Sequence, residues 1–154
     1  MKYTNLFETE GCNQMIERIN LLNSESKPLW GKMTVSQMLA HCAVPYEYEF
    51  NPEKYGPPAS GIKKVVMRLF LKSTIAGPKS YKKNSTTAPD FRVADDREFE
   101  KEKSQLIDYI RKTQALGANH FVAKETQSIG KLTADEWNTM YAKHLDHHLK
   151  QFGV

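Results

Sequence analysis

The chain has 154 residues, a formal net charge of +4, 40% hydrophobic residues and 26% charged residues. A chain of this length buries roughly 70% of the surface that it exposes when unfolded, so it needs neither disulfides nor a metal ion to close its core. Its hydrophobic and aromatic content excludes a disordered protein. We therefore predict a single globular domain over residues 1–154, in which any bound metal ion serves function.

The cysteines and the hydropathy pattern indicate a compartment. Cys12 and Cys42 lie far apart and outside any CxxC motif, which argues against a disulfide framework and a sulfur-rich zinc site. The first residues lack the apolar core of a signal peptide, and no stretch approaches the roughly 18 apolar residues of a membrane span. We predict a cytoplasmic protein that has no membrane partner. Its basic residues are spread among acidic ones, so we expect no nucleic-acid partner either.

The first half of the chain contains two predicted helices and a loop. Apolar residues at helical spacing predict the first helix over residues 10–23. A capping-box pattern at Thr34 opens the second helix, over about Thr34–Tyr48, and Pro45 is expected to kink it or end it early. Proline and glycine then predict a loop over residues 51–61.

An amphipathic segment follows the loop. Its basic residues lie outside a stripe of apolar residues that have helical spacing: Ile62, Val65, Val66, Leu69 and Phe70. Such a helix can bind a membrane surface or an anion. The alternative is a helix that packs on the domain and leaves its lysines in solvent. We favour packing, because any packed helix needs such an apolar face. Residues 77–94 then form a long connection, of the length that often covers a functional site.

The second half of the chain contains two further main helices. One is predicted over residues 95–116, opened by two aspartates and closed by Gly117. Residues 118–132 have no assignment, and no stretch alternates regularly enough to predict a strand. A second capping-box pattern at Thr133 opens the last helix, which ends near Gly153. Four main helices, with an extra amphipathic helix and long loops between the second and third, predict an all-α four-helix bundle.

The last predicted helix carries His144, His147 and His148. At about 100° per residue, His144 and His148 lie about 40° apart, within the apolar stripe that contains Trp137 and Tyr141. One helical turn apart, they can each direct a ring nitrogen at one point beside the helix, as a metal-binding pair requires. His147 lies at the edge of the stripe, where it supports the site or faces solvent.

A metal site needs a third ligand, and the remaining histidines are His41 and His120. His41 lies within a predicted helix, whereas His120 follows a glycine in irregular sequence, so His41 is the better candidate. With His144 and His148 it would form a site with open positions for water or substrate, as in catalytic metal centres. The alternative is that these histidines are structural or lie at a polar helix end. Leu145 follows His144 where a zinc protease has glutamate, which argues against that mechanism.

The histidine-bearing segments resemble a known superfamily. Residues 144–153, His-Leu-Asp-His-His-Leu-Lys-Gln-Phe-Gly, resemble the last-helix signature of the DinB/YfiT-like superfamily, and residues 30–42 resemble its second-helix histidine motif. Together with residues 130–137, they are similar to an uncharacterised branch of it, a domain-of-unknown-function family, over nearly the whole chain. The resemblance implies an up-down-down-up four-helix bundle, often dimeric, with a divalent metal ion, often zinc or nickel, held by His41, His144 and His148.

Characterised members of the superfamily include thiol-dependent S-transferases and a thiol-dependent isomerase. The resemblance thus implies a metal-dependent transferase or hydrolase that acts on a small-molecule substrate, with a low-molecular-weight thiol as a possible cosubstrate, and a possible homodimer. The alternative is a non-catalytic bundle that binds a metal ion or small molecule. Cys42 points away from His41 and is expected in the core. For an acidic thiol, several lysines are candidates to supply positive charge at the pocket mouth: Lys63, Lys64, Lys79, Lys82 and Lys83.

Overall fold

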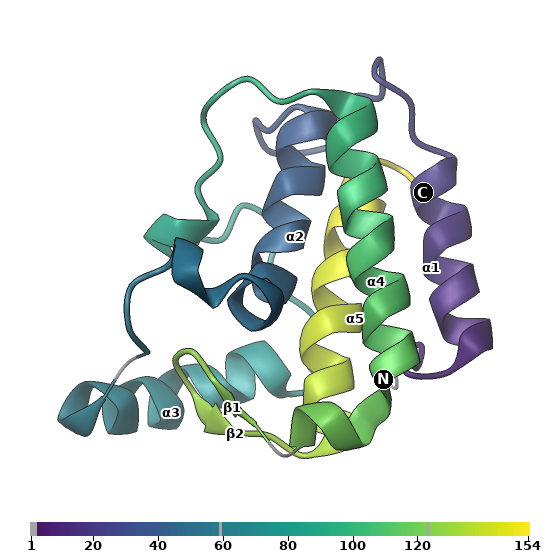
Figure 1. Ribbon diagram of the computed structural model, residues 1–154. Helices are drawn as coiled ribbons and strands as arrows, with labels where there is room; N and C mark the ends of the chain where they lie inside the picture. The colour runs from purple at the N-terminus through teal and green to yellow at the C-terminus, as the bar shows by residue number, and fades with distance from the viewer. Residues whose placement is uncertain (1–2, 59, 123) are drawn as a thin grey trace.

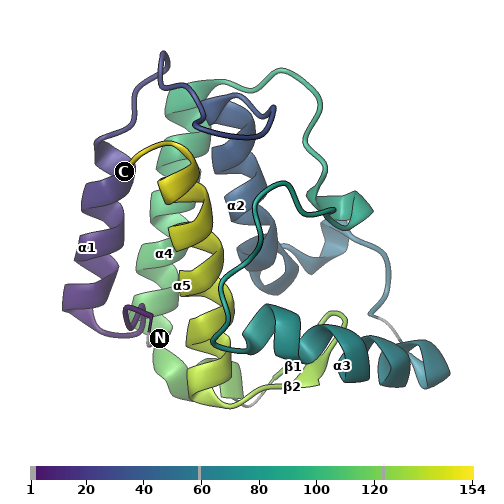
Figure 2. The ribbon, with the colours of Figure 1, turned by 180° about the vertical axis from the view of Figure 1, so that it is seen from behind.

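The computed structural model describes residues 3–58, 60–122 and 124–154, with only the backbone at 63 and 64. Within these residues the chain is mostly helical, and its one sheet has two short strands. Four helices lie side by side, and a fifth, α3 (Gly61–Ala76), lies across one end of them (Figures 1 and 2). The broad all-α prediction is therefore confirmed. The four helices are α1 (Thr9–Asn20), α2 (Val35–Phe50), α4 (Phe99–Val122) and α5 (Ala134–Gln151).

The predicted capping box opens α2. The Gln37 backbone N–H donates to the Thr34 hydroxyl, and the Thr34 backbone N–H donates to the Gln37 side chain. The helix continues past Pro45 to Phe50, so the predicted early end is wrong. A proline inside a helix removes one backbone hydrogen bond. Pro45 is buried, and α2 packs against both α4 and α5, so we attribute the continuation of the helix to tertiary packing.

The helix α4 begins at Phe99, four residues later than predicted, because Glu98 caps it instead of the two aspartates. The Glu98 carboxylate accepts hydrogen bonds from the backbone N–H groups of Glu100 and Lys101. Gly117, at φ 69°, interrupts the helical geometry, as a glycine readily does. The helical segment nevertheless resumes beyond it, so the predicted end at Gly117 is only a kink.

A small hairpin joins α4 to α5, in the region that the sequence left unassigned. β1 (Glu125–Thr126) pairs antiparallel with β2 (Gly130–Lys131). The second predicted capping box, between Thr133 and Glu136, then opens α5. Two short 3-10 turns, η1 (Pro52–Lys54) and η2 (Pro89–Phe91), lie in the predicted loops.

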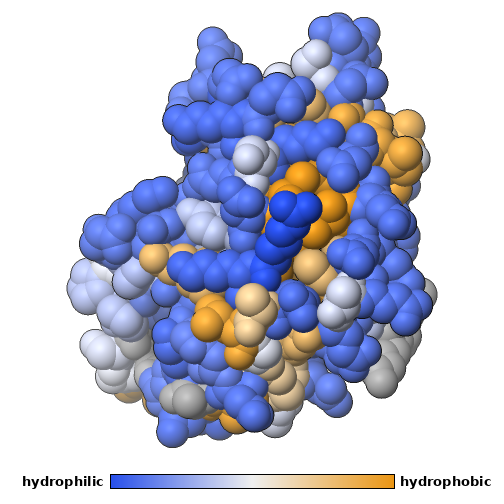
Figure 3. All heavy atoms as spheres, turned by 45° about the vertical axis from the view of Figure 1, so that its right-hand side comes forward, coloured by the Kyte–Doolittle hydropathy of each residue, from blue (hydrophilic) through white to orange (hydrophobic). Residues whose placement is uncertain are grey.

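The hydrophobic core lies between α1, α2, α4 and α5. The Tyr46 and Tyr141 rings stack 4.5 Å apart at its centre, and Phe121 packs against Tyr141. The face on the α1 side is mostly hydrophilic, with small apolar areas between polar side chains (Figure 3). None of the helices in the described residues combines the length and apolar character needed to cross a bilayer.

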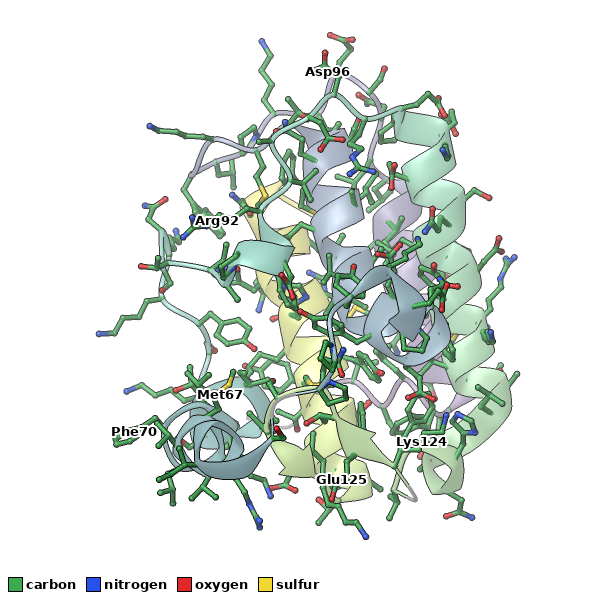
Figure 4. The ribbon with its side chains drawn as sticks, turned by 60° about the vertical axis from the view of Figure 1, so that its left-hand side comes forward. Met67, Phe70, Arg92, Asp96, Lys124 and Glu125 are labelled. Atoms are coloured by element: carbon green, nitrogen blue, oxygen red, sulfur yellow. The ribbon has the colours of Figure 1, made fainter. Side chains whose placement is uncertain are left out.

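The apolar stripe of α3 is exposed, so the prediction that it packs on the domain is wrong. The stripe residues are 48–85% exposed: Ile62, Val65, Val66, Leu69 and Phe70. Phe70 points away from the other helices (Figure 4). The last turns of α3 do pack on the protein: Ala76 is buried, and Lys72 pairs with Glu136 at 2.8 Å. The first turns of α3 extend beyond the helices on which its last turns pack.

Leu69→Ala should change the free energy of unfolding by less than about 0.5 kcal/mol, because the Leu69 side chain is 71% exposed. The control is Leu39→Ala, which truncates a fully buried side chain and should cost about 2–5 kcal/mol. Urea unfolding followed by circular dichroism measures both. A cost above about 1 kcal/mol for Leu69→Ala would show that this stripe is packed in solution.

Candidate metal centre

The three histidines predicted as ligands lie together between α2 and α5. His41 comes from the middle of α2, and His144 and His148 lie on successive turns of α5. The Nε2 atoms of His41 and His144 are 2.9 Å apart, and one ring nitrogen from each residue lies within 4.8 Å of the others. The three residues are only 4%, 9% and 8% exposed, respectively. This histidine triad (His41, His144 and His148) could hold a metal ion.

Hydrogen bonds orient two of the three rings. Nδ1 of His41 lies 2.7 Å from the carbonyl oxygen of Phe91 in η2, and a carbonyl only accepts, so this nitrogen carries the proton. Nδ1 of His148 lies 2.8 Å from Oε1 of Gln151. Gln151 donates its Nε2 to the carbonyl of Trp30, which leaves Oε1 as the acceptor. In each neutral ring, Nε2 therefore keeps a free lone pair.

His144 has a different environment. Its Nε2 faces Nε2 of His41, and its Nδ1 is buried and has no hydrogen-bond partner. In the metal-free protein, Nε2 of His144 must donate the proton between the two rings, because Nε2 of His41 has none. A metal ion would instead take the lone pairs of both nitrogens.

Burial keeps all three histidines neutral. Loss of solvent lowers the pKa of His144 well below its usual range, and the neighbouring His41 and His148 lower it further. Burial lowers the pKa of His148 to about 3. It also lowers the pKa of His41, although the hydrogen bond to Phe91 opposes the shift. Neutral imidazoles are the form of histidine that binds metal ions.

The long connection between α3 and α4 covers the triad, as its length suggested. The Phe91 ring lies 5.5 Å from the His41 ring and 5.8 Å from the His144 ring, measured between centroids. The Tyr81 ring lies 6.4 Å from that of His144. Sequence reasoning did not single out these aromatic residues, because irregular sequence carries no periodicity. It also missed Gln151, whose position three residues after His148 on one helix was a usable signal.

The chain matches a protein family over residues 3–153, which include the whole triad. The family is described as protein of unknown function, DUF1569. The chain belongs to this family. Comparisons with curated proteins and with solved structures gave no match. The family match fits the expected domain of unknown function.

The other candidate residues of this DUF1569 protein lie around the triad or away from it. The half-buried His147 ring contacts the rings of Trp30 and Tyr81, at 5.9 and 5.7 Å, beside the triad. His120 is bonded to Glu49 at 3.0 Å through its Nε2. These positions agree with the choice of His41 over His120.

Cys42 is a core residue, as predicted. It is buried, and its thiol donates to Sδ of Met38 at 3.6 Å. Burial raises the pKa of this thiol far above its usual range, so the reactive thiolate is disfavoured. Cys42 therefore does not act as a nucleophile in the described arrangement.

Among the candidate lysines whose side chains the structure describes, one lines a pocket beside the triad. Lys83 lines this pocket together with His147. Lys79 and Lys82 are exposed and are not among its lining residues. The side chains of Lys63 and Lys64 lie outside the described residues.

Proposed function

We propose that the protein is a metal-dependent enzyme whose histidine triad holds a divalent ion, zinc or nickel. The observation that carries the proposal is the convergence of three buried, neutral imidazoles from two helices. In the metal-free protein one hydrogen bond joins the facing Nε2 atoms of His41 and His144, and a bound ion would replace it with metal–nitrogen bonds. One ion would satisfy the facing nitrogens of all three rings at once.

The dimensions of the triad fit such an ion. Zinc binds histidine nitrogen at about 2.0–2.1 Å, so two of its nitrogen ligands lie about 3–3.5 Å apart. The triad nitrogens are separated by 2.9 Å in one pair and lie within 4.8 Å overall. Small rotations of the rings would place all three around one ion. Nitrogen donors suit zinc and nickel in particular.

We infer that the protein is a member of the DinB/YfiT-like superfamily, with an up-down-down-up four-helix bundle. The side-by-side packing of α1, α2, α4 and α5 supports this topology. Three histidines leave coordination positions open, and a bound divalent ion lowers the pKa of a water or thiol there. The proposed reaction is thiol-dependent transfer to a small molecule, with a low-molecular-weight thiol as cosubstrate, or hydrolysis. The free, buried Cys12 and Cys42 fit a reducing cytoplasm.

The alternative is a non-catalytic bundle that binds a metal ion or a small molecule. One observation favours it: Asp146, between the two histidines of α5, pairs with Arg18 and Lys150 at 3.0 and 2.8 Å. Because its carboxylate is held in these ion pairs, Asp146 is not placed to act as a general base. Turnover of thiols and electrophilic substrates by the metal-loaded protein would separate the enzyme from the binder.

Metal content tests the proposal. Tag-free protein should hold about one zinc or nickel ion per chain by elemental mass spectrometry. His144→Ala and His41→Ala should each lose the ion, because two nitrogens form an incomplete site. The matched control is His120→Ala, which removes a histidine bonded to Glu49 and should keep the metal. Wild-type protein that stays empty after incubation with zinc and with nickel would refute the proposal.

A further inference from the structure

A small pocket lies directly beside the histidine triad. Its volume is about 160 Å³, and residues from α5 and from the connection after α3 line it. Two side chains link it to the triad. The lining residue Tyr81 has its ring 6.4 Å from the His144 ring, and the lining residue His147 has its ring 4.9 Å from the His148 ring. The pocket and the triad are thus separated by single side chains.

Lys143 contributes a buried positive charge to this pocket. The residue is 1% exposed, and its Nζ donates to the carbonyl oxygens of Thr74 and Gly77 at the end of α3. These carbonyls take two of the three N–H donors of the ammonium, and Nζ also lies 4.7 Å from the centre of the Tyr81 ring. Among the described residues, no carboxylate forms an ion pair with Lys143.

The remaining charges leave the pocket positive. Asp146 is the acidic residue that lines it, and its ion pairs with Arg18 and Lys150 already neutralise its charge. Nζ of Lys83 lies 4.1 Å from the centre of the Trp30 ring, and Lys83 forms no ion pair with any residue that the structure describes. Lys83 and Lys143 therefore both lack an acidic partner in the part of the chain that the structure describes. Lys83 is exposed to solvent, whereas Lys143 is buried, and a buried cation costs several kcal/mol unless it is compensated.

We propose that this pocket binds the oxyanion group of a small molecule, a carboxylate or a phosphate, and so holds the substrate beside the metal ion. The link to the metal ion rests on the proposed function, whereas the anion site stands on the pocket itself. A volume of about 160 Å³ equals that of about five water molecules. This size suits a head group and is well below the roughly 300–1,000 Å³ that a drug-sized ligand fills. The Trp30 and Tyr81 rings offer apolar contact beside the charges.

Titration of the metal-free, ¹⁵N-labelled protein with inorganic phosphate tests the anion site. The backbone amide signals of Lys83, Lys143 and His147 should shift and saturate at millimolar phosphate. Lys83→Met should weaken this binding about fivefold or more, because it removes one of the two unpaired charges. The matched control is Lys82→Met, which removes the neighbouring exposed lysine outside the pocket and should leave the affinity unchanged.

Lys143→Met should weaken phosphate binding most, but it also removes the hydrogen bonds from Lys143 to the end of α3. If the Lys143→Met protein does not fold, Lys83→Met still decides the test. Absence of saturable shifts in wild type, or equal weakening by Lys83→Met and Lys82→Met, overturns the anion site. Zinc affinity is measured separately, and Lys83→Met should bind zinc as wild type does. Phosphate binding without zinc binding supports the anion site and overturns the metal-dependent function. Zinc binding without phosphate binding supports the metal site and overturns the anion site.

Discussion

Zinc at about 1,000 times its dissociation constant should raise the free energy of unfolding of the metal-free protein by about 4 kcal/mol. For a chain of this length, that gain corresponds to a rise of about 8–16 °C in the melting temperature. The gain arises because the site exists only in the folded state. His41 and His144 are 103 residues apart in sequence, and packing of α2 on α5 is what brings their nitrogens to 2.9 Å.

Substitutions in the triad and in the residue that orients it should change this zinc-dependent stabilisation by different amounts. His144→Ala should abolish the zinc-dependent shift, and His120→Ala should retain it in full. Gln151→Leu removes the acceptor that orients the His148 ring, and it should weaken zinc binding about 10–100-fold. Differential scanning calorimetry with and without zinc measures all three. A shift in His144→Ala equal to that of wild type would place the bound zinc elsewhere on the protein.

The pairing of His144 and His148 on one helix could be predicted from sequence, whereas the residues that cover the triad could not. His144 and His148 share a helix face because of their spacing, which is a property of four consecutive peptide units. His41 followed from its place in a predicted helix and from the superfamily resemblance. Phe91 and Tyr81 lie in irregular sequence, and their contacts with the triad depend on the path of a long connection. That path is set by tertiary packing and leaves no periodic signal.

The α3 helix shows the limit of amphipathicity as a signal. The spacing of its apolar residues predicted the helix itself, and the structure has one there. The pattern could not specify whether another element covers the apolar face, because burial depends on where the helix is placed. Pro45 shows the opposite case: its intrinsic preference predicted an end to α2, and the helix continues through buried surroundings.

Lys143 escaped prediction because lysine is rarely buried. Asp146, three residues later on the same helix, would suggest an exposed ion pair with Lys143, but it pairs instead with Arg18 and Lys150. Its hydrogen-bond acceptors are the carbonyls of Thr74 and Gly77, which are 69 and 66 residues away in sequence. Backbone carbonyls are present at every position, so they carry no sequence signal. Only the docking of the end of α3 on α5 identifies them as partners.

Acid should destabilise the metal-free protein well before its carboxylates titrate. Burial lowers the folded-state pKa of His41, His144 and His148 below the unfolded value of about 6.5. As the pH falls below that value, the unfolded chain binds protons that the folded chain does not. The free energy of unfolding therefore has its full value above about pH 7 and decreases as the pH falls. At pH 5 each histidine that stays neutral in the folded state costs up to about 2 kcal/mol.

Urea unfolding of the metal-free protein between pH 7.5 and pH 5 measures this loss. His148→Gln should flatten the pH dependence, because burial lowers the pKa of His148 to about 3 and this histidine therefore stays neutral throughout the range. Saturating zinc should raise the free energy of unfolding at every pH in this range without steepening its pH dependence, because the buried triad histidines take up no proton in the folded state with or without the ion. A free energy of unfolding that stays constant from pH 7.5 to pH 5 would mean that the triad takes up protons in the folded state, which would contradict three buried neutral imidazoles.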